Sequence, residues 1–146
     1  MKRTILIFLL AGLLFSTGIQ SHGENKITQN EKYEDAKIVL TDLAVLVEGF
    51  VENMNKADQP KDIANVLNKF TDSMKGLLPK INEIREKYPE LNKEDTHPEE
   101  LKPLLQRIDK DFQEMMKAYA KVISNIEDPA VKEADTKYKE VMSSLG

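Results

Sequence analysis

The chain has 146 residues, of which 40% are hydrophobic, 25 are acidic and 21 are basic, giving a net charge of −4. A mildly acidic chain without a basic stripe is a poor candidate for binding nucleic acid or an anionic membrane. The sequence contains no cysteine. This excludes both disulfide bonds and a lipid-modified cysteine, so a folded domain must be stabilised by its core alone.

The first 23 residues have the order of parts of a secretory signal peptide. Lys2 and Arg3 are followed by an apolar run over 5–15 and then by small residues. The run has about 11 residues, fewer than the ~20 that span a membrane as a helix. Cleavage after Gly18 or Gly23 fits the small residues, and we favour Gly23. We therefore expect a periplasmic or secreted protein without a stable membrane anchor, the alternative being that the segment is retained as an anchor.

Residues 24–30 are polar and unpatterned, and we interpret them as a flexible leader before a single domain at 31–146. Within that domain, apolar residues recur at alternating steps of three and four in four segments. This spacing is typical of helices that bury one face. We predict helices at 31–57, 60–88, 97–127 and 129–145. The fold class is therefore all-α, an antiparallel up-down-up-down four-helix bundle in which short connections make consecutive helices neighbours.

Residues at the predicted helix boundaries support this division. Asp58 and Asp128 each stand shortly before a proline, where an acidic cap and an early proline favour a helix start. Thr96 is followed three residues later by a glutamate, the pattern of a capping box. Tyr88 precedes a proline and therefore marks a helix end.

The second helix contains Pro79 within its apolar pattern, with Gly76 just before it. The pattern continues across Pro79, so we expect a kinked helix; a break into two helices is the alternative. Pro103 lies at a similar height in the third helix, and we expect a second bend there.

The fourth helix is the shortest, so the end of the bundle near residue 92 is predicted to have three helices and one uncovered apolar flank. An open apolar flank is a candidate for binding a partner or a second copy. The alternative is that the end of the bundle or the leader closes it. The predicted flank consists of Ala36, Val39, Leu40, Leu101, Leu104 and Leu105.

Motifs for catalysis and metal binding are weak. After the predicted signal peptide the only histidine is His97, which follows Glu94 with the Glu-x-x-His spacing of di-iron bundles. That motif occurs once and has no second histidine, so a solvated turn is the preferred interpretation. There is no glycine-rich phosphate loop and no nucleophile motif. We predict no catalytic, metal or cofactor-binding residues and no enzymatic activity.

The order of parts resembles the soluble b-type cytochrome four-helix bundles of the bacterial periplasm. The likeness rests on the turn at 55–58 (Asn-Lys-Ala-Asp) before a helix, a proline-containing acidic loop, and a final helix that carries Tyr138. In that family a methionine and a histidine bind haem. The methionine position falls here on Ala44, and no histidine follows His97, so the resemblance implies the fold without the haem. The chain also looks like small exported helical proteins of Gram-negative bacteria.

From these observations we expect an exported, non-catalytic interaction module that binds a peptide, a partner helix or its own copy. The alternative is a haem or small-molecule carrier derived from a cytochrome-like bundle.

Overall fold

The structure is a computed structural model that describes residues 32–92 and 97–144. These residues form four long helices: α2 (Glu34–Lys56), α3 (Pro60–Lys87), α4 (Lys102–Ser124) and α5 (Pro129–Ser143). A short 3-10 helix, η1 (Pro89–Asn92), follows α3, and the described ranges contain no strand. The predicted all-α four-helix bundle is confirmed. The predicted signal peptide (1–23) and leader (24–30) lie outside the described residues.

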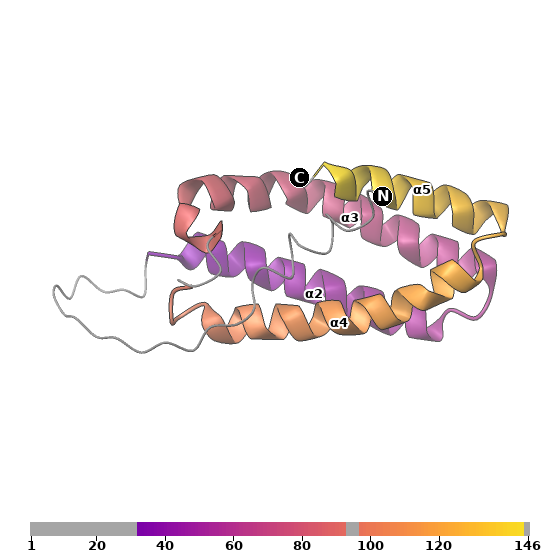
Figure 1. Cartoon of the computed structure of the whole chain (residues 1–146), viewed down its shortest axis with the longest axis horizontal. Coiled ribbons are helices and arrows are strands. Elements are labelled where there is room, and N and C mark those ends of the chain that lie inside the picture. The colour runs from indigo at the N-terminus through magenta and orange to yellow at the C-terminus, as the bar shows by residue number, and fades with distance from the viewer. Residues whose placement is uncertain (1–31, 93–96, 145–146) are drawn as a thin grey trace, which may run out of the picture.

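The four helices form two layers (Figure 1). α2 packs against α4 in one layer, α3 packs against α5 in the other, and contacts between α2 and α3 join the layers. Followed through the colours of Figure 1, each helix runs in the direction opposite to the one before it. α5 has 15 residues and α3 has 28, so α5 covers only about half the length of α3.

The predicted adjacency of the second and third helices is wrong. α3 and α4 follow one another in the chain, yet they have few close contacts, whereas α2 and α4 are direct neighbours. The connection runs from Tyr88 to Leu101 and includes η1. It is long enough to let α4 pack beside α2 instead of α3, because only short connections force adjacency.

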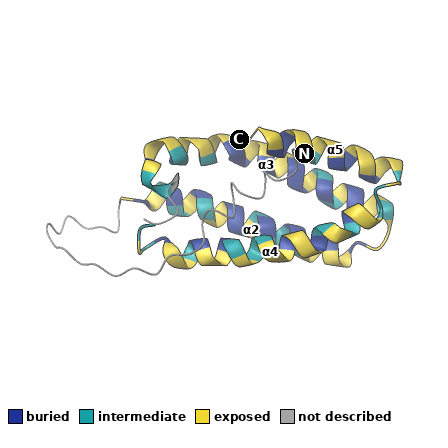
Figure 2. Cartoon of the chain, in the orientation of Figure 1, coloured by how far each residue is buried: buried dark blue, intermediate teal, exposed yellow. Residues whose placement is uncertain are grey.

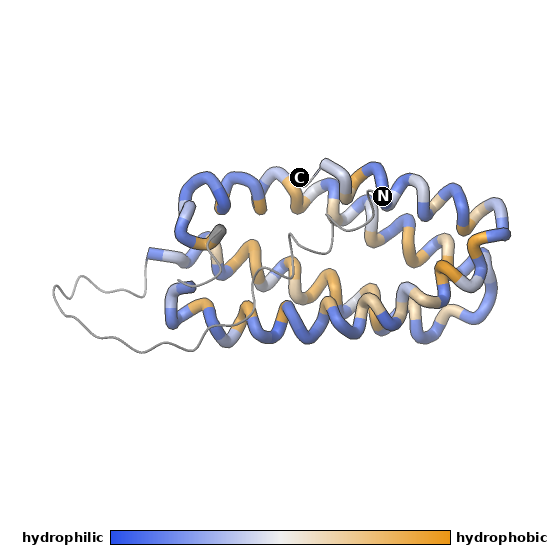
Figure 3. Tube along the Cα trace, viewed as in Figure 1, coloured by the Kyte–Doolittle hydropathy of each residue, from blue (hydrophilic) through white to orange (hydrophobic). Residues whose placement is uncertain are grey.

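The core lies between the two layers and is formed by the apolar stripes of the helices. Buried positions are dark on the inward-facing sides in Figure 2, and the hydrophobic positions in Figure 3 follow the same sides. On α2 the stripe runs from Ala36 to Met54, and on α3 from Ile63 to Ile84. Met54, Leu67 and Leu101 are completely buried. The spacing of three and four therefore predicted the buried faces well.

Side chains and prolines mark several helix ends as expected. The Asp128 carboxylate accepts hydrogen bonds from the backbone N–H groups of Ala130 (2.9 Å) and Val131 (3.3 Å), the geometry of an N-cap. α3 begins at Pro60 and ends directly before Tyr88. Asp58 is not a cap, because the N-cap residue of α3 is Gln59 and its side chain makes no capping hydrogen bond.

The two helix-interior prolines of the sequence prediction have different positions. α3 continues through Pro79 as one helix, so the alternative of two separate helices is wrong. Proline has no backbone N–H, so the Lys75 carbonyl receives no hydrogen bond from residue 79. Pro79 and Lys75 are both exposed. α4 begins at Lys102 rather than at residue 97, which places Pro103 in its first turn. A proline there removes no helical hydrogen bond, so this position gives no physical reason for a second bend.

A polar network joins the start of α2 to the segment after α3. The rings of Tyr33 and Tyr88 are 4.9 Å apart, and the Tyr88 hydroxyl donates to the Asp35 carboxylate at 2.8 Å. The Tyr33 hydroxyl donates to the Glu90 carboxylate at 2.7 Å, and the Lys32 ammonium lies 3.0 Å from the same carboxylate. These contacts lower the pKa of Glu90 to about 2, with the Tyr33 hydrogen bond as the largest cause.

Candidate functional site

The flank predicted from the sequence is not exposed in the structure. Leu40 and Leu104 are partly buried against the core, and the other four residues are buried: Ala36, Val39, Leu101 and Leu105. The reason is that α4 packs beside α2 and not beside α3. Because α4 lies beside α2, the stripes of these two helices face each other instead of leaving one side uncovered.

Charged residues reinforce the contact between α2 and α4. The Arg107 guanidinium donates two hydrogen bonds to the Glu48 carboxylate, at 2.8 and 2.7 Å. The Lys121 ammonium donates to the backbone carbonyls of Asn55 and Ala57, each at 2.9 Å, at the end of α2. This side of the bundle is closed by both apolar and polar contacts.

The large apolar side chains that remain exposed lie elsewhere. Among the described residues, Ile38 and Val45 of α2 are 61% and 57% exposed, and Met116 and Ile123 of α4 are 57% and 63% exposed. The members of each pair are seven residues apart and therefore lie on one helix face. Single exposed apolar residues are ordinary, but Val45 lines a concave surface.

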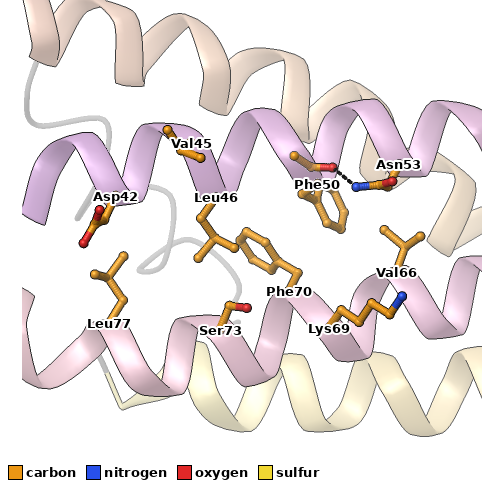
Figure 4. A pocket seen from close by; sticks show the side chains of 11 residues that line it. Asp42, Val45, Leu46, Phe50, Asn53, Val66, Lys69, Phe70, Ser73 and Leu77 are labelled. Carbon is orange, nitrogen blue, oxygen red and sulfur yellow. Dashed lines mark hydrogen bonds between the residues drawn. The ribbon is translucent and has the colours of Figure 1, made fainter.

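A groove with a volume of about 530 Å³ lies between α2 and α3 (Figure 4). Six of its lining residues come from α2 and five from α3. The lining residues are Asp42, Val45, Leu46, Gly49, Phe50, Asn53, Val66, Lys69, Phe70, Ser73 and Leu77. Binding sites of this size with mostly apolar walls and a few polar groups are common in proteins. We refer to this surface as the α2–α3 groove.

Two phenylalanines form the floor of the α2–α3 groove. The rings of Phe50 and Phe70 are 4.9 Å apart and tilted by 57°. Both side chains are buried, while Leu46 and Val66 beside them are partly exposed. The aromatic pair is therefore fixed by the core and presents an apolar surface at the base of the groove.

Gly49 lies in the middle of the groove and in the middle of α2. A Cβ atom built at Gly49 would meet nothing within 4 Å, so packing in the structure does not require glycine there. Glycine inside a helix costs about 0.5–1 kcal/mol relative to alanine. Glycine at this position leaves the centre of the groove without a side chain.

The charged lining residues are Asp42 and Lys69. Neither forms a hydrogen bond or an ion pair with any residue that the structure describes. Figure 4 shows Asp42 at one end of the groove near Leu77 and Lys69 towards the other end, near Val66. The Asn53 side chain donates to the Gly49 carbonyl at 2.6 Å. The groove therefore has an apolar centre and one unpaired charge of opposite sign at each end.

Sequence reasoning missed the groove because it used the stripes alone. Val45 and Gly49 lie beside the stripe of α2 rather than on it, and a single exposed valine is not unusual. The available signal was the combination of Ile38 and Val45, seven residues apart, with a glycine one turn further along the same face.

A second cluster of polar groups lies between α4 and α5. The Tyr119 hydroxyl donates to the Asp135 carboxylate, and the Lys139 ammonium donates to the other carboxylate oxygen. Burial, followed by Asp135, raises the pKa of the Tyr119 hydroxyl, and burial raises that of Tyr138 to about 12. Hydroxyls that stay protonated are hydrogen-bond donors rather than general bases. The cluster is therefore a polar contact that holds α5 against α4.

His97 precedes α4 and is partly buried. Neither ring nitrogen has a hydrogen-bond partner within the described part of the chain, and burial followed by Lys102 lowers the pKa of the imidazole. Glu94, the other member of the Glu-x-x-His motif, lies outside the described residues. Across residues 32–92 and 97–144, no group of three or more His, Cys, Asp or Glu is placed to hold a metal ion. None of the helices there is long and apolar enough to span a membrane.

The comparisons with known proteins give no relatives: no family model, no curated protein and no solved structure matches the chain. The fold and the α2–α3 groove therefore define the protein only as an all-α four-helix bundle with an apolar groove on one side.

Proposed function

We propose that the chain is a non-catalytic binding module whose α2–α3 groove receives the apolar face of a partner helix. The observation that carries the proposal is an open apolar groove beside a closed core. Val45 is 57% exposed above a fixed floor of Phe50 and Phe70. Binding an amphipathic helix in such a groove is a common mode of peptide recognition.

The shape of the groove supports a helical ligand. Its two walls are neighbouring helices, and α2 contributes lining residues from Asp42 to Asn53. This stretch extends for about 16 Å, or three helical turns. The axes of packed helices lie roughly 8–10 Å apart, depending on the side chains at the contact. Gly49, at the centre of the groove, would let a bound helix approach α2 closely.

A probe peptide tests this proposal. The probe is a fluorescent 14-residue amphipathic helix, about four turns long, with leucines at spacings of three and four and no net charge. Gly49→Leu places a side chain in the groove, where the apolar face of the probe would otherwise be buried. We expect this loss of buried apolar area to weaken probe binding at least about ten-fold. Gly76→Leu is the matched control, because Gly76 is also an interior helix glycine with open space around it but does not line the groove.

Binding is measured by fluorescence anisotropy, and circular dichroism establishes that both variants keep the helix content of the parent. Equal affinity of the Gly49→Leu and Gly76→Leu proteins for the probe would contradict the proposal, as would the absence of probe binding to the parent protein.

We further propose that the protein is exported, on the basis of the signal-like order of residues 1–23. Expression of the full chain in a Gram-negative host is expected to give a periplasmic product that lacks this segment. Intact-mass spectrometry identifies the new amino terminus. Recovery of the uncleaved chain from the cytosol would contradict export.

The haem-carrier alternative receives no support from the groove. None of the residues that line it is a histidine or methionine, the side chains that ligate haem iron in b- and c-type cytochromes. Met54 lies near the last turn of α2, and His97 precedes α4 at the opposite end of the bundle. We therefore do not propose this function.

A further inference from the structure

We propose that the α2–α3 groove binds its partner helix in one direction, with the amino end of that helix near Asp42 and the carboxyl end near Lys69. The bound helix would run parallel to α2 and antiparallel to α3. This inference rests on the proposed function, because it concerns the orientation of the ligand in the same groove.

The charges of the lining residues carry the inference. Asp42 and Lys69 lie at opposite ends of the groove, and all the lining residues between them are uncharged. Both side chains lack a partner within the described residues. Elsewhere on the described surface, many charged residues are paired, including Lys56 with Glu52 and Lys137 with Glu133. Two unpaired charges of opposite sign therefore remain at the ends of an apolar surface.

The ends of a helix complement this arrangement. The first turn of a helix has free backbone N–H groups and a partial positive charge, and the last turn has free carbonyls and a partial negative charge. A carboxylate such as Asp42 stabilises the first kind of end, and an ammonium such as Lys69 stabilises the second. A helix of about three turns would place both of its ends at these charges at once.

Each interaction of this kind changes affinity roughly two- to five-fold at low ionic strength. Reversal of the bound helix would lose both interactions and place like charges together. We therefore expect about a ten-fold preference for the proposed direction at low salt, decreasing as salt screens the end charges.

The first test uses two probe peptides with the same leucine stripe and the same composition. One carries lysine in its first turn and glutamate in its last turn, and the other has these residues exchanged. The parent protein is expected to bind the first peptide about ten-fold more tightly. Asp42→Lys combined with Lys69→Asp should invert the preference. For each protein we take the ratio of its affinities for the two peptides. Dividing the ratio of the parent by that of the double variant cancels any difference in the intrinsic helicity of the peptides.

The second test measures the direction itself. The chain has no cysteine, so single cysteines at the exposed positions Thr41 and Asn55 can carry a fluorophore near each end of the groove. A nitroxide at the amino end of the bound peptide should quench the label at Thr41→Cys more strongly than the label at Asn55→Cys. A nitroxide at the carboxyl end should give the opposite result.

The outcomes separate the two proposals. Binding of both peptides with equal affinity and equal quenching at both labels would overturn the orientation and leave the binding function intact. Failure of every peptide to bind would overturn both. Both proposals would also be overturned if dodecanoate, but neither peptide, displaced a hydrophobic dye from the groove. That result would assign the groove to a small amphiphile. A dimer in light scattering that Gly49→Leu dissociates would assign the groove to a second copy of the chain.

Discussion

The two edges at which the layers of the bundle meet are built differently. At the α4–α5 edge, Tyr119 of α4 bonds to the buried carboxylate of Asp135 on α5, and the rings of Tyr119 and Tyr138 are 5.4 Å apart. At the α2–α3 edge, Phe50 and Phe70 meet below a groove whose charged residues have no partner in the described part of the chain. At the α4–α5 edge the helices have few close backbone contacts and are joined by polar groups, whereas the α2–α3 edge is closely packed and carries an apolar groove.

The difference between the two edges supports the proposal that a partner binds at the α2–α3 edge. Buried polar groups in proteins are almost always hydrogen-bonded, and the contact of Tyr119 with Asp135 satisfies this rule. The α2–α3 edge instead contains an interior glycine and an exposed valine, neither of which improves the stability of the fold. An edge that only had to hold the layers together would not need these features.

Phe70→Ala is expected to have the largest effect, because Phe70 connects the two edges. Its ring lies 4.9 Å from Phe50 and 6.1 Å from Tyr138. Removing a buried phenylalanine side chain costs about 3–5 kcal/mol of unfolding free energy. Urea unfolding followed by circular dichroism measures the loss. The control is Met116→Ala at an exposed position, for which we expect a change within about 0.5 kcal/mol.

Tyr119→Phe tests the polar contact at the α4–α5 edge alone. The substitution leaves one oxygen of the buried Asp135 carboxylate without its donor, at a cost of about 1–3 kcal/mol. Probe binding at the α2–α3 groove should be unchanged per folded molecule. A double-mutant cycle with Asp135→Ala, which removes the acceptor, measures the pairwise interaction. A coupling energy near zero would show that this edge is held by packing and not by the polar contact.

Pro79→Ala is expected to change unfolding free energy by no more than about 1–2 kcal/mol, and to increase it. Alanine restores the hydrogen bond to the Lys75 carbonyl and has a higher helix propensity than proline. Native packing that is adapted to the proline offsets part of that gain. Thermal unfolding measures the net change. A much lower melting temperature would show that proline is required at this position.

The smallest effect is expected from acid, and it concerns the end of the bundle rather than either edge. The folded-state pKa of Glu90 is about 2, below its usual value of 4.5. A lowered pKa contributes stability above the usual value, and this contribution is lost as pH falls from about 5 towards 2. Glu90→Gln should reduce the difference in melting temperature between pH 7 and pH 3. An unchanged difference would show that the contact of Glu90 with Tyr33 and Lys32 does not stabilise the fold.

The apolar stripes were sufficient to predict four helices and their buried faces, and the prolines and capping acid predicted the ends at Pro60, Tyr88 and Asp128. These features depend on local spacing and local hydrogen bonds. The stripes could not predict which helix each face contacts, because a buried face on α2 is compatible with either α3 or α4 as the neighbour. The predicted flank depended on that choice, and residues such as Leu101 and Leu105 are buried as a result.

The start of α4 and the groove were missed for other reasons. A helix from residue 97 would have placed Pro103 in its interior, where its ring clashes with the carbonyl of Glu99. Starting at Lys102 avoids this clash. The groove depends on the distance between α2 and α3, which is a tertiary property. Gly49 was visible in the sequence, but its significance required knowledge of the space around it.

The packing of α4 against α2 also has a kinetic consequence. The hydrogen bond between Arg107 and Glu48 joins residues that are 59 apart in sequence. The hydrogen bond from Lys121 to the Asn55 carbonyl joins residues that are 66 apart. Closing loops of this length costs conformational entropy before any contact between α2 and α4 is gained. Folding rates decrease as the average sequence separation of contacts increases. The chain should therefore refold more slowly than a bundle of equal length in which every helix packs against its successor.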